Sequence, residues 1–169
     1  YLEALREAYP ALVNVPSETI PFGYSAADFD VANELGEPWR PFAVSEPKAP
    51  VALYAGRIGE AMLPAIDALF QFMNAVPTDA PGALSKLTAG FLGTGYLREG
   101  NPREAVPRAE VIGLEARVAE RPDRVSMLDA LSSLLAADLL ILLGSADLTY
   151  QPSKLYQLMA TGKPILCIA

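Results

Sequence analysis

Residues 139–168, LLILLGSADLTYQPSKLYQLMATGKPILCI, contain the pattern that decides the fold. The run 139–143 is apolar at every position, which is typical of a strand that is buried on both faces. A polar loop follows, then a segment with apolar residues at helical spacing, and then the apolar run 165–168. A strand, a helix and a second strand in this order predict a βαβ unit of a parallel sheet. We expect the helix to have Ser153 as its N-cap, Leu155, Leu158 and Met159 as its buried stripe, and Thr161 and Gly162 as its stop.

The same alternation extends over the rest of the chain, which predicts an α/β fold with a Rossmann-like, doubly wound parallel sheet of about six strands. Apolar side chains recur at helical spacing over 62–73 and 127–135, which predicts two further helices. Residues 16–50 and 93–107 show no sustained period, so we expect a crossing segment or long loop and a shorter loop there. The expected strands are 11–15, 51–55, 87–92, 117–120, 139–143 and 165–168.

The length of 169 residues suits one domain, and we interpret 1–169 as a single unit in which 1–50 is partly an interdomain segment. A charge of −7 with no basic cluster argues against a nucleic-acid partner.

The chain has no His, which excludes hydrolases with a Ser-His-Asp triad and zinc sites built from His, and we expect no metal site. The one cysteine, Cys167, excludes a disulfide framework, and we expect it to be buried. We find no transmembrane run or signal peptide, so a cytoplasmic location is expected, with peripheral contact at the inner membrane face as an option.

Polar and basic residues follow the predicted strands where ligands bind in open parallel sheets, beyond the carboxyl ends of the strands. A helix that begins at Ser153 would direct unpaired N–H groups into the loop, and Lys154 adds a full charge there. Arg57, after another strand, offers a planar guanidinium for phosphate oxygens. These groups predict a diphosphate site. The alternative is that Ser153 only caps a helix and Lys154 is a solvated surface charge.

The segment GTGYLREG, residues 93–100, follows the strand at 87–92 and invites a dinucleotide interpretation. However, Gly100 lies five residues after Gly95 rather than three, which departs from the Rossmann fingerprint. The simpler account is that Gly93 and Gly95 permit a tight turn or the close approach of a ligand.

Five segments together resemble the C-terminal, donor-binding half of GT-B glycosyltransferases of family four, the group 1 type. The resemblance covers about residues 11–169, and its most specific part is PSKLYQLMATGKPIL. The five segments are TIPFGYSAADF at 19–29, LYAGRIGE at 53–60, GFLGTGY at 90–96, RVAERPDRVSMLDALSSLLAADLLILLGS at 117–145, and PSKLYQLMATGKPIL at 152–166.

The resemblance implies a retaining transferase that moves a sugar from a nucleoside-diphosphate sugar to an acceptor. The donor is a co-substrate, so no separate cofactor is implied. The acceptor would bind an N-terminal domain that is not part of this chain. The chain alone is therefore not expected to catalyse the transfer of the sugar. By resemblance, Arg57 and Lys154 are catalytic groups that stabilise the leaving diphosphate. The implied donor-binding residues are Gly56, Gly93, Thr94, Gly95, Arg124, Val125, Ser145, Ser153 and Gln157. Among them, Arg124 and Val125 occupy the segment that lines the nucleobase in the family.

The sequence departs from the family pattern at two positions of the 144–164 segment. The paired glutamates of the family align with Thr149 and Gln157, and Gln157 cannot offer the charge-assisted bond of a carboxylate. A second hypothesis is therefore a catalytically degenerate GT-B module with a scaffold or regulatory role. A sugar-nucleotide epimerase of the same fold is a third, although such enzymes depend on histidine.

Overall fold

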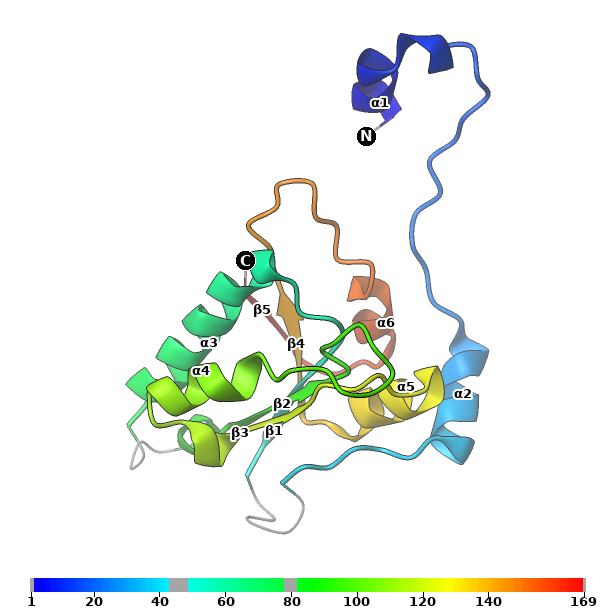
Figure 1. Ribbon diagram of the computed structural model, residues 1–169. Coiled ribbons are helices and arrows are strands. Elements are labelled where there is room, and N and C mark those ends of the chain that lie inside the picture. Colours follow the sequence, from blue (N-terminus) through cyan, green and yellow to red (C-terminus); the bar gives the residue numbers. More distant parts are fainter. Residues whose placement is uncertain (1, 43–48, 78–81, 169) are drawn as a thin grey trace.

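The computed structural model describes residues 2–42, 49–77 and 82–168. Within these residues, five parallel strands form one sheet in the order β3-β2-β1-β4-β5. The strands are β1 (Val51–Ala55), β2 (Thr88–Leu92), β3 (Val118–Arg121), β4 (Leu139–Leu143) and β5 (Ile165–Ile168). The predicted doubly wound parallel α/β fold is confirmed (Figure 1).

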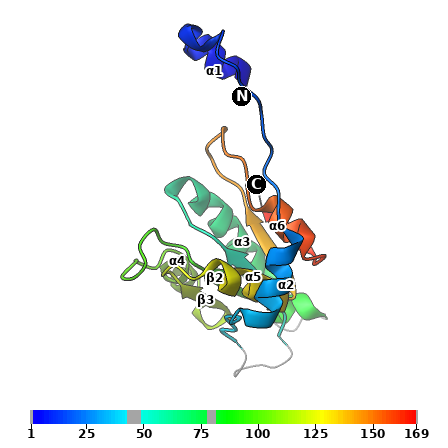
Figure 2. The ribbon, with the colours of Figure 1, turned by 90° about the vertical axis from the view of Figure 1, so that its right-hand side faces the viewer.

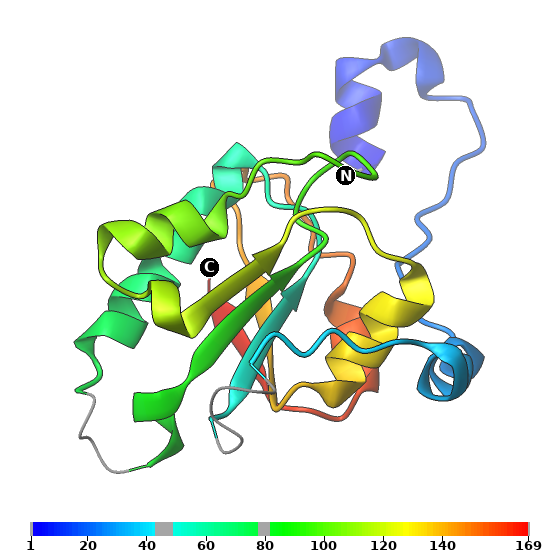
Figure 3. The ribbon, with the colours of Figure 1, turned by 60° about the horizontal axis from the view of Figure 1, so that its bottom comes forward.

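Helices cover both faces of the sheet (Figures 1 and 3). One face carries α3 (Leu63–Ala75), which follows a short turn η2 (Glu60–Met62), and α4 (Ala105–Val111). The other face carries α2 (Ala26–Leu35), α5 (Met127–Ala136) and α6 (Leu155–Ala160). The remaining elements are α1 (Leu2–Ala8) and the short turns η1 (Pro10–Leu12), η3 (Ala83–Lys86) and η4 (Glu115–Arg117).

The two cores explain why the strands are apolar without alternation. Ile141 and Leu143 of β4 pack with α3, whereas Leu140 and Leu142 pack with α5 and α6. Successive side chains of a strand point to opposite faces, so both faces of β4 must be apolar. The helical period over 62–73 and 127–135 has the same cause, because α3 and α5 each bury one stripe against the sheet.

Four local expectations were wrong. Residues 11–15 form no strand: they are exposed, and a short turn η1 ends there with the Val13 N–H donating to the Pro10 carbonyl at 3.2 Å. The described sheet therefore has five strands rather than six. Cys167 is exposed because β5 is an edge strand of this sheet. Met159 is also exposed, and the helix begins at Leu155 with Lys154 as its N-cap rather than Ser153.

Two helices lie in segments that were expected to be loops. Helix α2 lies within 16–50 and docks on α5, where Gly36 lets the two backbones approach closely and the Trp39 N–H donates to Ser133 Oγ at 2.9 Å. Helix α4 begins at Ala105, inside the expected loop 93–107. By contrast, α1 and the chain that follows it extend away from the sheet in two views (Figures 1 and 2).

The strand order places a topological switch point between β1 and β4. The chain runs outward from β1 to β2 and β3, and then returns to β4 on the other side of β1. The loops after β1 and β4 therefore diverge to opposite faces and leave a crevice beyond the strand ends, which is where open α/β sheets bind ligands.

Candidate functional site

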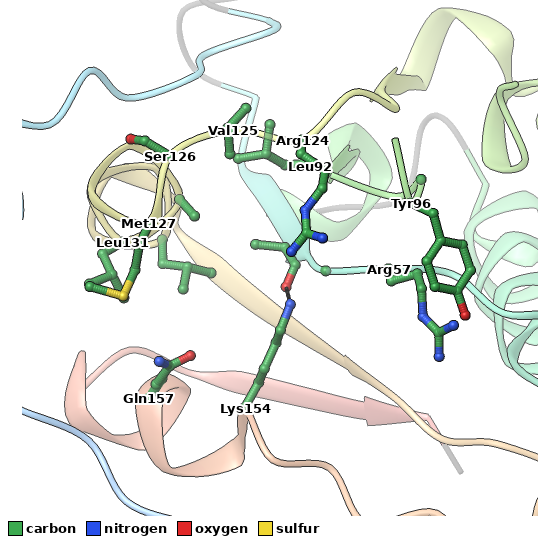
Figure 4. A pocket seen from close by; sticks show the side chains of 16 residues that line it. Arg57, Leu92, Tyr96, Arg124, Val125, Ser126, Met127, Leu131, Lys154 and Gln157 are labelled. Atoms are coloured by element: carbon green, nitrogen blue, oxygen red, sulfur yellow. Dashed lines mark hydrogen bonds between the residues drawn. The ribbon is translucent and has the colours of Figure 1, made fainter. Parts of the chain in front are cut away.

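A cavity of about 520 Å³ lies at this crevice. Its walls come from the ends of β1 and β2, from the start of α5, and from α6 (Figure 4). Eight of the predicted site residues line it, so the fold brings together most of what the sequence analysis selected. They are Gly56, Arg57, Gly93, Gly95, Arg124, Val125, Lys154 and Gln157.

The lining carries three cations, Arg57, Arg124 and Lys154, and no carboxylate. The Lys154 amine and the Arg124 guanidinium point toward one another across the cavity (Figure 4). Burial, and then the charge of Arg124, lower the pKa of Lys154 below its ordinary value. Positive charges that converge without an acid between them repel one another, so an anion in the cavity would be stabilised.

Lys154 reaches the cavity through a gap that only a glycine leaves open. Lys154 is an exposed residue, and its amine donates to the Ala55 carbonyl at 2.7 Å in a partly buried hydrogen bond. A Cβ at Gly56 would collide with the Lys154 Nζ, and Gly56 has a φ of +155°. A glycine at position 56 is thus required for the observed position of the Lys154 amine.

Arg57 is fixed at both its backbone and its side chain. The Tyr54 hydroxyl donates to the Arg57 carbonyl at 2.6 Å, and the guanidinium carbon lies 4.3 Å from the centre of the Tyr96 ring. Burial raises the pKa of Tyr54, so this hydroxyl remains a donor even at alkaline pH. Sequence reasoning missed Tyr96, although it directly follows the Gly93-Thr94-Gly95 segment and is an exposed aromatic residue.

Three predicted residues lie outside the cavity lining. Thr94 is buried, and its hydroxyl donates to Glu120 Oε1 at 2.7 Å. Ser145 accepts a hydrogen bond from the Asp147 N–H at 3.1 Å, within its own loop. Ser153 is exposed and precedes a helix of six residues that has no side-chain cap.

The loop after β2 is held by two polar side chains that sequence reasoning did not select. Glu120 is buried on β3 and accepts from the Thr94 hydroxyl and from the backbone N–H groups of 104, 105 and 106 at 2.8 to 3.1 Å. Asn101 donates to the Leu97 carbonyl at 2.8 Å and to Asp123 at 3.0 Å. A Cβ at Gly95 would collide with Asn101, so this glycine serves the close packing of its own loop. An acidic residue in a predicted strand was the only available signal for Glu120.

The rest of the lining is mostly apolar, and half of it comes from α5. Ser126 caps this helix by accepting the Asp129 N–H at 3.1 Å, which fixes the start of the helix beside the cavity. The helical spacing of 127–135 was assigned only to the core, although the same stripe also reaches the cavity. The additional lining residues are Ala55, Leu92, Tyr96, Ser126, Met127, Ala130, Leu131 and Leu134.

No group of three or more acidic, His or Cys side chains that could hold a metal ion is found in residues 2–42, 49–77 and 82–168. In the same part of the chain, no helix has the length and apolar character needed to cross a bilayer.

The comparison with known proteins is informative at the level of structure. No family profile and no curated protein sequence match the chain. Among solved structures, it is similar to a UDP-forming α,α-trehalose-phosphate synthase from Burkholderia xenovorans, with a TM-score of 0.54 and 9% sequence identity. The chain has a GT-B glycosyltransferase-like fold. The match covers 87% of this chain and 36% of that enzyme, so the chain spans little more than a third of the length of the protein it resembles.

Proposed function

We propose that this chain is the donor-binding half of a glycosyltransferase and that its cavity binds a nucleoside-diphosphate sugar. One observation carries the proposal: three cations and no acid line a cavity at the switch point of a GT-B-like sheet. The structural neighbour is a UDP-forming enzyme, which supports a nucleoside diphosphate as the bound product. The acceptor would bind a partner domain, and we place the reaction in the cytoplasm.

The chemistry that such a site must support is the departure of a diphosphate from an anomeric carbon. Negative charge grows on the leaving phosphate oxygens, and preorganised cations stabilise it. Arg57 would present its N–H groups to the diphosphate from one side of the cavity, and Lys154 from the side of β1, where its amine keeps two further protons for a ligand. The donor is the co-substrate and no further cofactor is proposed. We also propose retention of configuration at the anomeric carbon.

We propose a different role for Arg124 from the one that the resemblance implies. The resemblance assigned it to the nucleobase together with Val125, but its guanidinium points toward Lys154 (Figure 4). The closeness of the two charges is also what lowers the pKa of Lys154 after burial. We therefore assign Arg124 to the diphosphate, and the apolar wall formed by Val125, Met127 and Leu131 to the base.

A panel of nucleotides tests the proposal. UDP, ADP, GDP and their glucose conjugates are added to the chain, and at least one should raise the melting temperature by several degrees, because ligands that bind only the folded state stabilise it. The double variant Arg57→Ala/Lys154→Met should abolish the shift. The matched control Lys86→Ala/Arg103→Ala removes two exposed cations outside the cavity and should keep it. A folded wild-type chain whose melting temperature responds to no member of the panel would refute donor binding.

The alternative of a degenerate module has two observations in its favour. Gln157 lines the cavity in place of a glutamate, and the Thr149 hydroxyl donates to Asp147 within its own loop at 2.7 Å instead of facing the cavity. Such a module would bind the nucleotide and not transfer the sugar. The two hypotheses are distinguished by supplying the full-length protein with mixed donors and acceptors. An active transferase would release nucleoside diphosphate, and a degenerate module would not.

A further inference from the structure

Tyr96 is a lining residue with an exposed ring at the rim of the cavity. It follows Gly95 in the loop after β2, and 66% of its surface is exposed. Its ring lies against the Arg57 guanidinium, whose carbon is 4.3 Å from the ring centre. In Figure 4 the two side chains lie together on the side of the cavity opposite Gln157.

Arg57 forms no ion pair with a carboxylate among the residues that the structure describes. The ion pair in that part of the chain joins Arg108 to Asp67. A free arginine side chain has many rotamers, and immobilising it on a ligand costs about 0.5 to 1.5 kcal/mol. A stack on an aromatic ring restrains the guanidinium and leaves its in-plane N–H groups available. A carboxylate partner would restrain it as well, but would occupy those N–H groups and neutralise the charge.

The ring can act as a support because its loop is tied down on both sides. Ahead of it, Thr94 bonds Glu120, and behind it the Leu97 N–H donates to Asn101 at 2.8 Å. The backbone of Tyr96 is therefore held in place on both sides, while its ring remains at the surface.

We propose that Tyr96 is a positioning residue for the diphosphate: it holds Arg57 by a cation–π stack in an orientation that presents the guanidinium N–H groups to the phosphate oxygens. This inference rests on the proposed function, since it assigns a role at the same site. Its action is on Arg57, so its effect should vanish when Arg57 is removed.

The test is a calorimetric titration with UDP, ADP and GDP. Tyr96→Leu should weaken binding of the preferred diphosphate by about two- to fivefold, as expected for an exposed cation–π contact. Tyr96→Phe keeps the ring and should bind like the wild type. Tyr24→Leu, a change at an exposed tyrosine outside the cavity, is the matched control and should also bind like the wild type. In an Arg57→Ala background, Tyr96→Leu should have no further effect.

Two results would overturn the inference while donor binding stands: unchanged affinity in Tyr96→Leu, or a loss of the same size with and without Arg57. If none of the three diphosphates binds the wild type, the proposed function and the inference fall together.

The contact between Tyr96 and Arg57 can also be measured without a ligand. The Arg57 side-chain protons should show an upfield ring-current shift by NMR in the wild type and in Tyr96→Phe, and lose it in Tyr96→Leu. Its absence in the wild type would contradict the stack.

Discussion

The two loops that flank the cavity differ in how they are held. The loop after β2, residues 93–104, is tied to the body of the domain by the buried Glu120 and by Asn101 with Asp123. The loop after β4, residues 144–154, is bonded mainly to itself through Asp147, and Leu148 at its tip is fully exposed. The first loop is preorganised, whereas the second can adapt to a ligand. Its attachments are at its ends, where Ala146 bonds the Ala61 carbonyl and Lys154 bonds the Ala55 carbonyl.

The strongest test of the preorganised loop is Glu120→Ala. The substitution leaves buried backbone N–H groups and the Thr94 hydroxyl without an acceptor, and hydrogen bonds to a charged group are worth about 1.5 to 3 kcal/mol each. We expect the free energy of unfolding, measured by urea denaturation, to fall by at least about 3 kcal/mol. Glu99→Ala, in the exposed part of the same loop, is the control. A loss in Glu120→Ala no larger than in this control would show that the loop is not held from β3.

Gly56→Ala tests the attachment of the second loop. The new methyl group would displace the Lys154 amine, and the φ of +155° would strain the backbone by about 1 to 3 kcal/mol. We expect lower stability and at least tenfold weaker nucleotide binding, roughly the loss of one charge-assisted hydrogen bond. Gly59→Ala is the matched control, because a Cβ there meets open space and its φ is −106°. Equal nucleotide affinities in the two variants would show that the position of the Lys154 amine does not contribute to binding.

The lowered pKa of Lys154 predicts a dependence of binding on pH. A protonated amine attracts a phosphate and a neutral amine does not, so affinity should fall as pH rises from neutrality toward the ordinary lysine pKa of about 10.4. Because the bound anion favours the charged form, binding should take up protons in this range. Calorimetry in buffers of different ionisation enthalpy measures the uptake. Lys154→Met should bind more weakly and lose the alkaline decline; a decline that persists in this variant would assign the titration to another group.

The smallest effect is expected in the adaptable loop. Asp147 accepts from the Thr149 hydroxyl at 2.7 Å and from the Thr149 N–H at 2.9 Å, and the hydroxyl bond and then the backbone bond lower its pKa. The carboxylate is fully exposed, so solvent screens it and replaces these bonds. Asp147→Ala should therefore leave the urea midpoint unchanged and raise only the hydrogen exchange of residues 147–150. A clear loss of stability would show that this loop is as firmly held as the loop after β2.

The sequence predicted the parts of the fold that depend on burial at every position. The run at 139–143 is a strand because both sheet faces are covered, and the 62–73 and 127–135 periods are helices because each buries one stripe. The run at 11–15, ALVNV, is also largely apolar, but it pairs with no strand among the residues that the structure describes, and β-propensity alone does not form a sheet. Helix α2 was missed because it is attached to the domain through Gly36 and Trp39, a docking contact without periodicity.

The candidate site was predictable as far as strand order could be inferred. Arg57, Gly93 and Lys154 follow different strands, and a parallel sheet brings these ends together. Side-chain direction was not predictable, which is why Thr94 was selected although it faces Glu120, and Tyr96 was not selected although it faces Arg57. Backbone spacing sets which loop a residue occupies, and packing sets where its side chain points.

Binding of a diphosphate by an acid-free set of three cations is tested most directly by a calorimetric series of uridine, UMP and UDP, repeated with the adenosine and guanosine compounds. Each charge-assisted hydrogen bond contributes about 1.5 to 3 kcal/mol, so for the preferred base the affinity should rise at least about tenfold from monophosphate to diphosphate. The Arg57→Ala/Lys154→Met variant should remove that step while still binding the nucleoside as the wild type does. An affinity that does not change along all three series, or a step that survives in the double variant, would contradict the account.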